Sequence, residues 1–169
     1  INVVKRPMRA AVLTSSDSGY AGEREDISGP AIKEILEKNG YEVVHTILLP
    51  DDREMLAKEM ARIADEYVAE LLLTTGGTGF SPRDCMPEAT MDIAERMVPG
   101  IPEAMRAYSM TITPRAMVSR AAACIRKNTL IINLQGSPKA VKESLGYILP
   151  SLQHGLEILT GEAANCARK

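Results

Sequence analysis

A glycine-rich stretch and two aspartates are the residues of this sequence whose types and spacing could support chemistry. Three glycines and two threonines fall within Thr75–Gly79, and Asp84 follows shortly after. A strand, a glycine loop and then a helix can direct backbone N–H groups at an anion. A carboxylate beside bound phosphate is repelled unless a divalent cation lies between them, so the pattern indicates a phosphate site with Mg²⁺.

The other carboxylate, Asp51, has two interpretations that the local sequence leaves even. The spacing Asp51-x-x-Glu54 is a helix-capping pattern, and Asp52 is a near-equal candidate for the same cap. Asp84 could also cap a helix that begins near Pro87, although it stands slightly early for that role. Two carboxylates on neighbouring loops are what Mg²⁺ between phosphates requires.

Several other nucleotide and hydrolase sites are disfavoured. The glycine stretch could be a plain tight turn. It is not a Walker loop, because no Gly-Lys-Ser/Thr follows it, and its spacing differs from the dinucleotide fingerprint. No Gly-x-Ser-x-Gly elbow exists, so His45 and His154 are expected to be structural. Phe80 lies in the glycine loop and is expected to anchor it. The cations that could meet phosphate, each with solvated surface charge as the default, are Arg83, Arg120 and Lys139.

The elements that must position these residues alternate between strand and helix in the first half. Apolar runs predict strands at Met8–Ser15, Tyr41–Leu49 and from Glu70 to Thr75. Helices are predicted from Pro30 to Gly40, from Pro50 onwards, and from Pro87 to about Met97. Three such units predict a three-layer α/β/α fold with a mostly parallel central sheet.

The second half is less regular. A helix is predicted near 102–108, an extended segment over 111–114, and a hairpin-like excursion of strands 121–125 and 129–134 around a three-residue loop. Two further helices, split at Pro150, are expected to follow. The expected organisation is an extension over residues 1–7, a single domain over 8–161 and a tail over 162–169.

Four polar loops are expected at the carboxyl ends of the strands, where ligands bind in open α/β sheets. These loops are 15–18, 50–52, 75–84 and 133–138. Their candidate substrate-binding residues are Ser16, Asp17, Thr75, Gly76, Gly77, Thr78, Gly79, Gly136, Ser137 and Pro138.

Composition excludes several partners. The formal net charge is −2, there is no Trp, and aromatic residues make up 4% of the 169-residue chain, so neither a nucleic-acid nor a membrane partner is expected. The three cysteines are odd in number and far apart, which argues against zinc or a disulfide framework and fits a cytoplasmic protein.

The run Thr75–Asp84 with Pro87–Thr90 closely resembles the signature of the Mog/MoaB family of molybdenum-cofactor biosynthesis. The resemblance extends over roughly 8–161, with further landmarks at 26–30, 50–52, 99–100, 113–114, 116–120 and 130–134. It implies a molybdopterin adenylyltransferase that uses Mg²⁺ and ATP, transfers AMP to the terminal phosphate of molybdopterin and releases pyrophosphate.

The resemblance also implies roles for individual residues. Asp51 and Asp84 would be the catalytic and metal-holding carboxylates, and Ser109, Ser119 and Asn133 would bind ligand. Arg120 lies within one of the matching motifs and is a further candidate for substrate binding. A homotrimer is expected, with possible hand-over to a molybdate-insertion protein.

Two departures from the family pattern are Cys85-Met86, where Val-Thr is usual, and Gln135, where many members have Pro; neither removes a charged or phosphate-binding group. A catalytically silent pterin-binding or assembly protein of the same family is one alternative. A nucleotide-processing hydrolase on the same fold is another, which the short chain disfavours. Retention of Asp51 and Asp84 favours the transferase.

Overall fold

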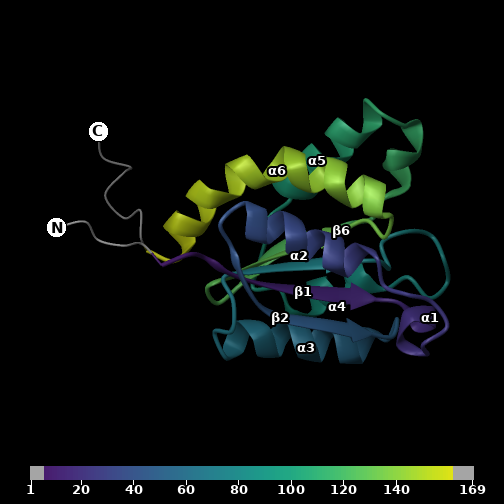
Figure 1. The fold of residues 1–169 in the computed structure, drawn as a ribbon, viewed down its shortest axis with the longest axis horizontal. Helices are drawn as coiled ribbons and strands as arrows, with labels where there is room; N and C mark the ends of the chain where they lie inside the picture. Colours follow the sequence, from purple (N-terminus) through teal and green to yellow (C-terminus); the bar gives the residue numbers. More distant parts are fainter. Residues whose placement is uncertain (1–5, 162–169) are drawn as a thin grey trace.

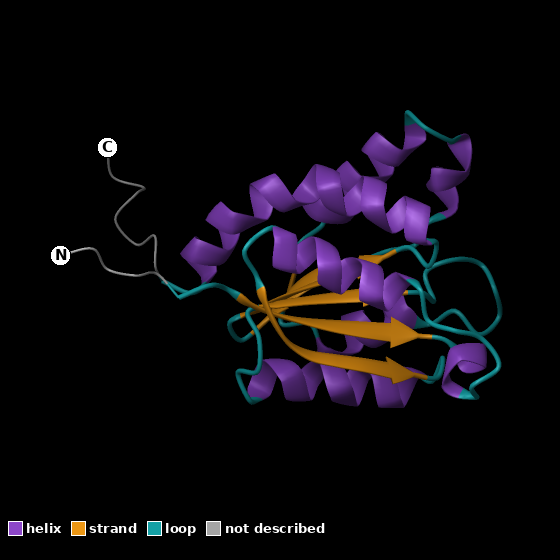
Figure 2. Ribbon diagram, viewed as in Figure 1, coloured by secondary structure: helices purple, strands orange, loops and turns teal. Residues whose placement is uncertain are grey.

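The computed structural model describes residues 6–161 and consists of a central sheet between two layers of helices (Figures 1 and 2). The strands are β1 (Arg9–Ser15), β2 (Glu42–Leu49), β3 (Leu71–Thr75), β4 (Arg96–Met97), β5 (Ala123–Arg126) and β6 (Thr129–Leu134). The helices are α1 (Asp17–Tyr20), α2 (Ser28–Lys38), α3 (Arg53–Asp65), α4 (Met86–Ile93), α5 (Gly100–Met110), the 3-10 helix η1 (Pro114–Val118) and α6 (Pro138–Leu159). The predicted three-layer α/β/α class is confirmed.

The register of the sheet brings the predicted site loops to one edge. The strand order is β2-β1-β3-β6-β5-β4, and the strands β2, β1, β3 and β6 are parallel to one another. Thr14 of β1 pairs with Thr75 of β3, which in turn pairs with Leu134 of β6. The loops after these three strands therefore start at the same level, and the loop after β2 starts beside them.

Alternation along the buried strands divides the core between the two faces of the sheet. Leu71 and Leu73 pack toward α2, α5 and α6, whereas Leu72 between them packs toward α3 and α4. Successive strand residues point to opposite faces, so a strand covered on both sides needs apolar residues at every position. This accounts for the continuous apolar runs in the sequence and fixes the strand ends that carry the loops.

The predicted hairpin is present and extends the main sheet. β5 and β6 are antiparallel, with Arg126 paired to Thr129, so the connecting loop has two residues where three were predicted. Lys127 in this loop has φ of 51°, a left-handed conformation suited to a tight turn. β4 then pairs antiparallel with β5 and forms the edge of the sheet.

The predicted break at Pro150 is wrong, because α6 is one helix of 22 residues that contains this proline. A proline inside a helix costs about 3 kcal/mol. Leu152 and Leu156, which follow the proline, are 4% and 0% exposed. Burying each such side chain contributes roughly 1.5–3 kcal/mol, so the two together offset the cost of the proline.

Three other boundaries differ from expectation. α4 ends at Ile93, and Arg96–Met97 joins the sheet as β4, where a helix to about Met97 was predicted. Residues 111–112 form a turn that continues α5, with the N–H of Ile112 donating to the carbonyl of Ser109, where an extended segment was predicted over 111–114; only Thr113, before η1, is extended. The short helix α1 within the first polar loop was not predicted.

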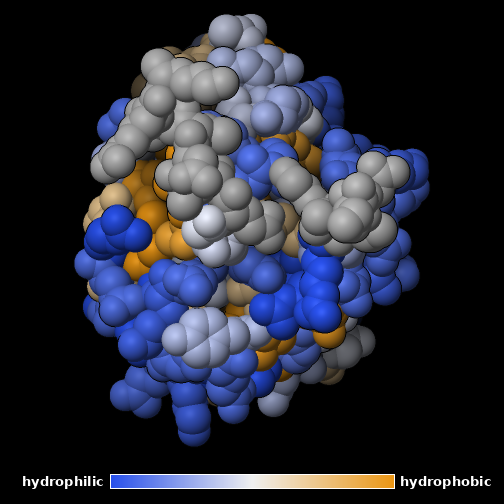
Figure 3. Space-filling model, turned by 90° about the vertical axis from the view of Figure 1, so that its left-hand side faces the viewer, coloured by the Kyte–Doolittle hydropathy of each residue, from blue (hydrophilic) through white to orange (hydrophobic). Residues whose placement is uncertain are grey.

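The end of the molecule opposite the site loops is where the described chain begins and ends (Figure 1). Figure 3 shows this end, whose described surface is largely hydrophilic with smaller hydrophobic areas. No described helix is both long and apolar enough to cross a membrane. Residues 1–5 of the expected extension and the expected tail lie outside the described residues.

Candidate functional site

The glycine loop after β3 requires glycine for two separate reasons. Gly76 and Gly77 have φ of 90° and 71°, which side-chain-bearing residues rarely adopt. A Cβ on Gly76 would also clash with the backbone carbonyl oxygen of Ser15 at the end of β1. The loop therefore lies directly against the neighbouring strand. The glycines are needed for a tight turn whether or not the loop also binds a ligand.

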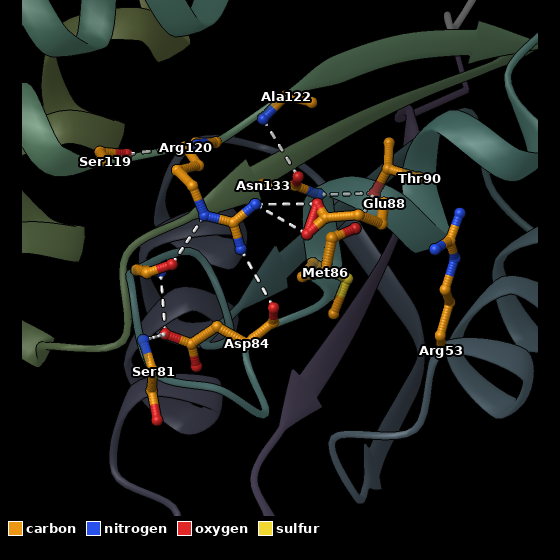
Figure 4. A network of polar contacts seen from close by, with 12 residues as sticks. Arg53, Ser81, Asp84, Met86, Glu88, Thr90, Ser119, Arg120, Ala122 and Asn133 are labelled. Carbon is orange, nitrogen blue, oxygen red and sulfur yellow. Dashed lines mark hydrogen bonds and ion pairs between the residues drawn. The ribbon is translucent and has the colours of Figure 1, made fainter.

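Asp84 is held inside this loop and does not cap α4. Its Oδ2 accepts hydrogen bonds from the backbone N–H groups of Gly79 and Ser81, both at 3.1 Å (Figure 4). Its Oδ1 has no hydrogen-bond partner among the described residues. The bond from Gly79 also means that this N–H is already used, so it is not free for phosphate as expected.

The structure decides between the two interpretations of Asp51. Asp52 is the N-cap of α3 and accepts from the N–H of Met55 at 2.9 Å. Asp51 is turned instead toward the first loop, where its Oδ1 accepts from Ser15 Oγ at 2.5 Å and its Oδ2 accepts from the N–H of Asp17 at 3.1 Å. The capping explanation is therefore wrong for Asp51 and correct for its neighbour.

Both carboxylates approach the glycine loop, at different residues. Asp51 Oδ1 lies 3.4 Å from the position that a Cβ of Gly77 would take, and Asp84 Oδ2 lies 3.0 Å from that position on Gly79. The two aspartates are half-buried, so their charges face a partly desolvated space. The loop residues between them are the place where charge from a ligand would be compensated.

A cavity of about 500 Å³ opens on one side of the glycine loop. The N-terminal ends of α2 and α6 reach it at Ser28 and Pro138, and helix N-termini favour anions. Its lining includes the predicted residues Ser16, Thr75, Gly76, Gly136, Ser137 and Pro138. Ser28 Oγ donates to the carbonyl of Gly136 at 2.6 Å, which joins its walls.

A second cavity of about 240 Å³ is lined by later residues of the same loop. Its lining includes the predicted residues Thr78, Gly79, Ser109 and Ser119. Apolar groups of Ala116, Val118 and Ala140 form part of the same wall, and Gln135 lines it as well. Gln135 Oε1 is buried without a hydrogen-bond partner among the described residues.

Arg120 supports the glycine loop from behind (Figure 4). Its Nε donates to the carbonyl of Gly79 at 2.7 Å and its Nη2 donates to the carbonyl of Asp84 at 3.0 Å. Its Nη1 pairs with Glu88 of α4 at 2.7 and 2.9 Å. The guanidinium is thus committed to the loop backbone and to α4.

Asn133 is fully buried, and both polar atoms of its side chain form hydrogen bonds. Its Nδ2 donates to the hydroxyls of Thr74 and Thr90, at 3.0 and 2.9 Å, while its Oδ1 accepts from the N–H of Ala122 at 3.1 Å. It is absent from the lining of the two cavities. Asn133 therefore joins β6 to β3, α4 and the start of β5.

Asp17, expected to bind substrate, uses both carboxylate oxygens within the protein. Arg83 Nε and Nη2 donate to Oδ2 and Oδ1 at 2.9 and 3.0 Å, and the N–H of Asp51 donates to Oδ1 at 3.0 Å. The hydrogen bonds from Arg83, followed by the backbone bond from Asp51, lower the pKa of the Asp17 carboxyl. This group is therefore anionic at neutral pH.

Sequence reasoning missed some cavity-lining residues and misplaced one aromatic. Arg24 lines the larger cavity, whereas Arg115 and Glu143 line the smaller one. No local pattern distinguishes these three from ordinary surface charges. Phe80 is 73% exposed, so the expectation that it anchors the glycine loop is wrong. His45 pairs with Glu59 at 2.9 Å on β2 and α3, which supports its expected structural place.

The two carboxylates suit one particular kind of metal site. Among the described residues, no group of three or more His, Cys, Asp or Glu could hold a metal ion. Mg²⁺ prefers oxygen ligands and is usually bound by one or two carboxylates together with substrate phosphates and water. The open Oδ1 of Asp84 and the carboxylate of Asp51 fit that donor set.

Comparisons with known proteins agree on one family. The model described as "Probable molybdopterin binding domain" matches residues 11–154. A molybdopterin adenylyltransferase of Helicobacter pylori J99 is 40% identical over 153 residues, covering 89% of this chain and 86% of that protein. The molybdopterin adenylyltransferase of Escherichia coli K12 is 38% identical over 141 residues, covering 82% and 72%.

A solved structure extends this agreement to the fold. The molybdopterin biosynthesis enzyme MoaB of Thermus thermophilus superposes with a TM-score of 0.86 at 45% sequence identity. The match covers 91% of this chain and 97% of that one. The resemblance first seen in the glycine-loop motif therefore extends over nearly the whole chain.

Proposed function

The chain belongs to the molybdopterin-binding domain family, and on that premise we propose that it is a molybdopterin adenylyltransferase. The observation that carries the proposal is the placement of Asp51 and Asp84 against one glycine loop whose residues line two cavities. A nucleotidyltransferase must bring two phosphate-bearing substrates together and compensate their charge. This arrangement provides one cavity for each substrate.

We assign ATP to the larger cavity and the pterin to the smaller one. The N-terminus of α6 and the guanidinium of Arg24 favour the triphosphate in the larger cavity. The carboxylates of Glu25 and Asp26 line it as well, and Asp26 accepts the N–H of Gly29 at the start of α2 at 3.0 Å. The smaller cavity combines apolar walls with the hydroxyls of Ser109 and Ser119 and the carboxylate of Glu143. Such a lining suits a flat heterocycle that carries N–H donors.

We propose that Asp51 and Asp84 would hold Mg²⁺ together with the substrate phosphates. The bound ion would neutralise charge on the phosphate oxygens during transfer. Both aspartates are oriented by backbone N–H groups, so their free lone pairs are directed without ligand present. Without that neutralisation, the two carboxylates would repel the phosphates they face.

In the proposed reaction the terminal phosphate oxygen of molybdopterin attacks the α-phosphorus of ATP. The bond from the α-phosphorus to the bridging oxygen breaks, and pyrophosphate leaves. The protein contributes alignment and charge compensation, because phosphoryl-type transfer needs little covalent help. Backbone N–H groups of the glycine loop other than that of Gly79 would bind phosphate oxygens.

The test is incubation with ATP, Mg²⁺ and molybdopterin, measuring adenylylated pterin and pyrophosphate. Asp51→Asn and Asp84→Asn are each expected to lower turnover by about 100-fold or more while changing the melting temperature little. Asp52→Asn is the matched control, since it removes the same charge one residue away and Asn still caps α3. Binding of pterin without transfer by the unaltered protein would favour the silent assembly protein, and turnover retained by both site variants would refute these roles.

We also propose a homotrimer that passes its product to a molybdate-insertion protein in the cytoplasm. Exposed apolar side chains on α5, η1 and α6 support contact between copies. They include Met110, Met117, Val118 and Tyr147. Light scattering after size-exclusion chromatography should give three times the chain mass, and a monomer at micromolar concentration would contradict the trimer.

A further inference from the structure

Arg83 and Asp17 form an ion pair that connects two loops far apart in the sequence. Arg83 directly precedes Asp84 at the end of the glycine loop, whereas Asp17 lies at the start of α1 after β1. Two parallel hydrogen bonds of 2.9 and 3.0 Å join the guanidinium to the carboxylate. This bidentate geometry fixes the direction as well as the distance of the contact.

Asp17 is in turn locked to Asp51 by a reciprocal exchange. The N–H of Asp51 donates to Asp17 Oδ1 at 3.0 Å, and the N–H of Asp17 donates to Asp51 Oδ2 at 3.1 Å. Each aspartate therefore fixes the other through one backbone and one side-chain group. Ser15 Oγ completes the chain of contacts at Asp51 Oδ1.

These contacts form a continuous path between the two carboxylates of the proposed site. From Asp84 it runs through the adjacent Arg83 to Asp17 and then to Asp51. The side chains of Arg83 and Asp17 are 64% and 43% exposed, and exposed ion pairs contribute little to stability. A solvent-facing pair that links two functional loops is better explained by placement of those loops than by stabilisation of the fold.

We propose that Arg83 and Asp17 are positioning residues that set the separation of the Asp51 and Asp84 carboxylates for adenylyl transfer. This inference rests on the proposed function. It gives Arg83 a contact to protein, where solvated surface charge was the default and phosphate contact the alternative, and it removes Asp17 from direct substrate binding. The pair acts on turnover, because misplacing reacting groups by 1 Å can lower a rate by about 10²-fold.

A double-mutant cycle separates positioning from direct phosphate binding. Arg83→Gln and Asp17→Asn break the same pair, since Asn keeps an oxygen for the N–H of Asp51 but loses the charge. Each is expected to lower kcat about ten- to a hundredfold with less than a threefold change in KM for ATP, and the double variant should be no slower than either single one. Effects that multiply in the double variant, or a KM for ATP that rises tenfold in Arg83→Gln alone, would overturn the proposal.

Amide hydrogen exchange tests the same pair without reference to activity. In Arg83→Gln the amides of Asp17 and Asp51 should exchange at least tenfold faster, as should those of Gly79 and Ser81, which donate to Asp84. Asp65→Asn is the matched control. Asp65 accepts two hydrogen bonds of 2.9 Å from Arg126, and this bidentate pair does not involve the site loops.

The control variant should leave the exchange rates of those four amides and the turnover unchanged. Unchanged exchange in Arg83→Gln would refute the positioning role even in a fully active enzyme. Absence of adenylyl transfer by the unaltered protein would instead refute the proposed function, while the exchange result would still decide whether the pair couples the two loops.

Discussion

Replacing Gly76 by alanine tests whether the close contact of the glycine loop with β1 is needed for transfer. The backbone φ of 90° is unfavourable for alanine, and the new Cβ would meet the carbonyl oxygen of Ser15. Gly40→Ala is a close control, because Gly40 has φ of 86° and nothing within 4 Å of the added Cβ. The two variants share the backbone strain and differ in the clash.

The expected magnitudes follow from these geometries. Alanine in the left-handed region costs about 1–2 kcal/mol, which lowers the melting temperature by roughly 2–8 °C in a chain of this size. At Gly76 the added Cβ lies inside 3.0 Å of backbone, whereas ordinary contact begins at 3.4 Å, so the loop must move by more than 0.4 Å. Overpacking of this kind costs roughly 1–3 kcal/mol more.

The assay compares turnover and melting temperature for both variants and the unaltered protein. Gly40→Ala should lose stability alone, with kcat within twofold of the unaltered value. Gly76→Ala should lose more stability and show kcat lowered about ten- to a hundredfold, because the displaced loop carries the contacts to Asp84. Equal turnover in the two variants would show that the contact with β1 does not position the site.

Further predictions concern the frame of the site and its titratable groups. Arg120→Gln should lower stability by roughly 2–3 kcal/mol in differential scanning calorimetry, since it leaves its carboxylate partner on α4 unpaired, and Arg120→Lys should restore little because lysine lacks the planar fork. Burial raises the pKa of Cys124 to about 12, so iodoacetamide at pH 8 should leave it unmodified in the native protein and label Cys85, which is only partly buried, slowly. Hydrogen bonding from Arg62 lowers the pKa of Glu59, so its stabilisation is present at neutral pH and lost as pH falls through that lowered value; Glu59→Gln should flatten the acid limb of the unfolding free energy.

The sequence predicted which loops gather at the candidate site better than it predicted the contacts within that site. Apolar runs ending in polar residues identified the parallel strands, and parallel strands place the loops that follow them at one edge. The pairing of Thr14 with Thr75 confirms that arrangement. The glycines were also informative, because positive φ and close contact both exclude side chains at Gly76.

The remaining features depended on contacts between segments distant in sequence. Asp51 and Asp52 are equivalent as local caps, and only the packing of α1 against the end of β2 selects Asp51 for the contact with Ser15. Pro150 is a helix breaker by local propensity, but burial of Leu152 and Leu156 against the sheet outweighs it. The family resemblance implied a ligand role for Asn133, and its hydrogen-bond partners on three other elements could not be predicted from its neighbours in the sequence.

The charge distribution explains how a weakly acidic chain can serve two polyanionic substrates. The net charge is −2, and Arg24 is the one cation among the described residues lining the larger cavity. Arg83, Arg120 and Arg53, which lies two residues after Asp51, are committed to protein carboxylates and carbonyls. Besides Arg24 in the larger cavity and Arg115 in the smaller one, phosphate charge must be compensated by backbone N–H groups, the N-terminus of α6 and the proposed ion between Asp51 and Asp84. Because these sources act only at fixed positions, the separation of the two carboxylates becomes the quantity on which transfer depends, and the Arg83–Asp17 pair is placed to set it.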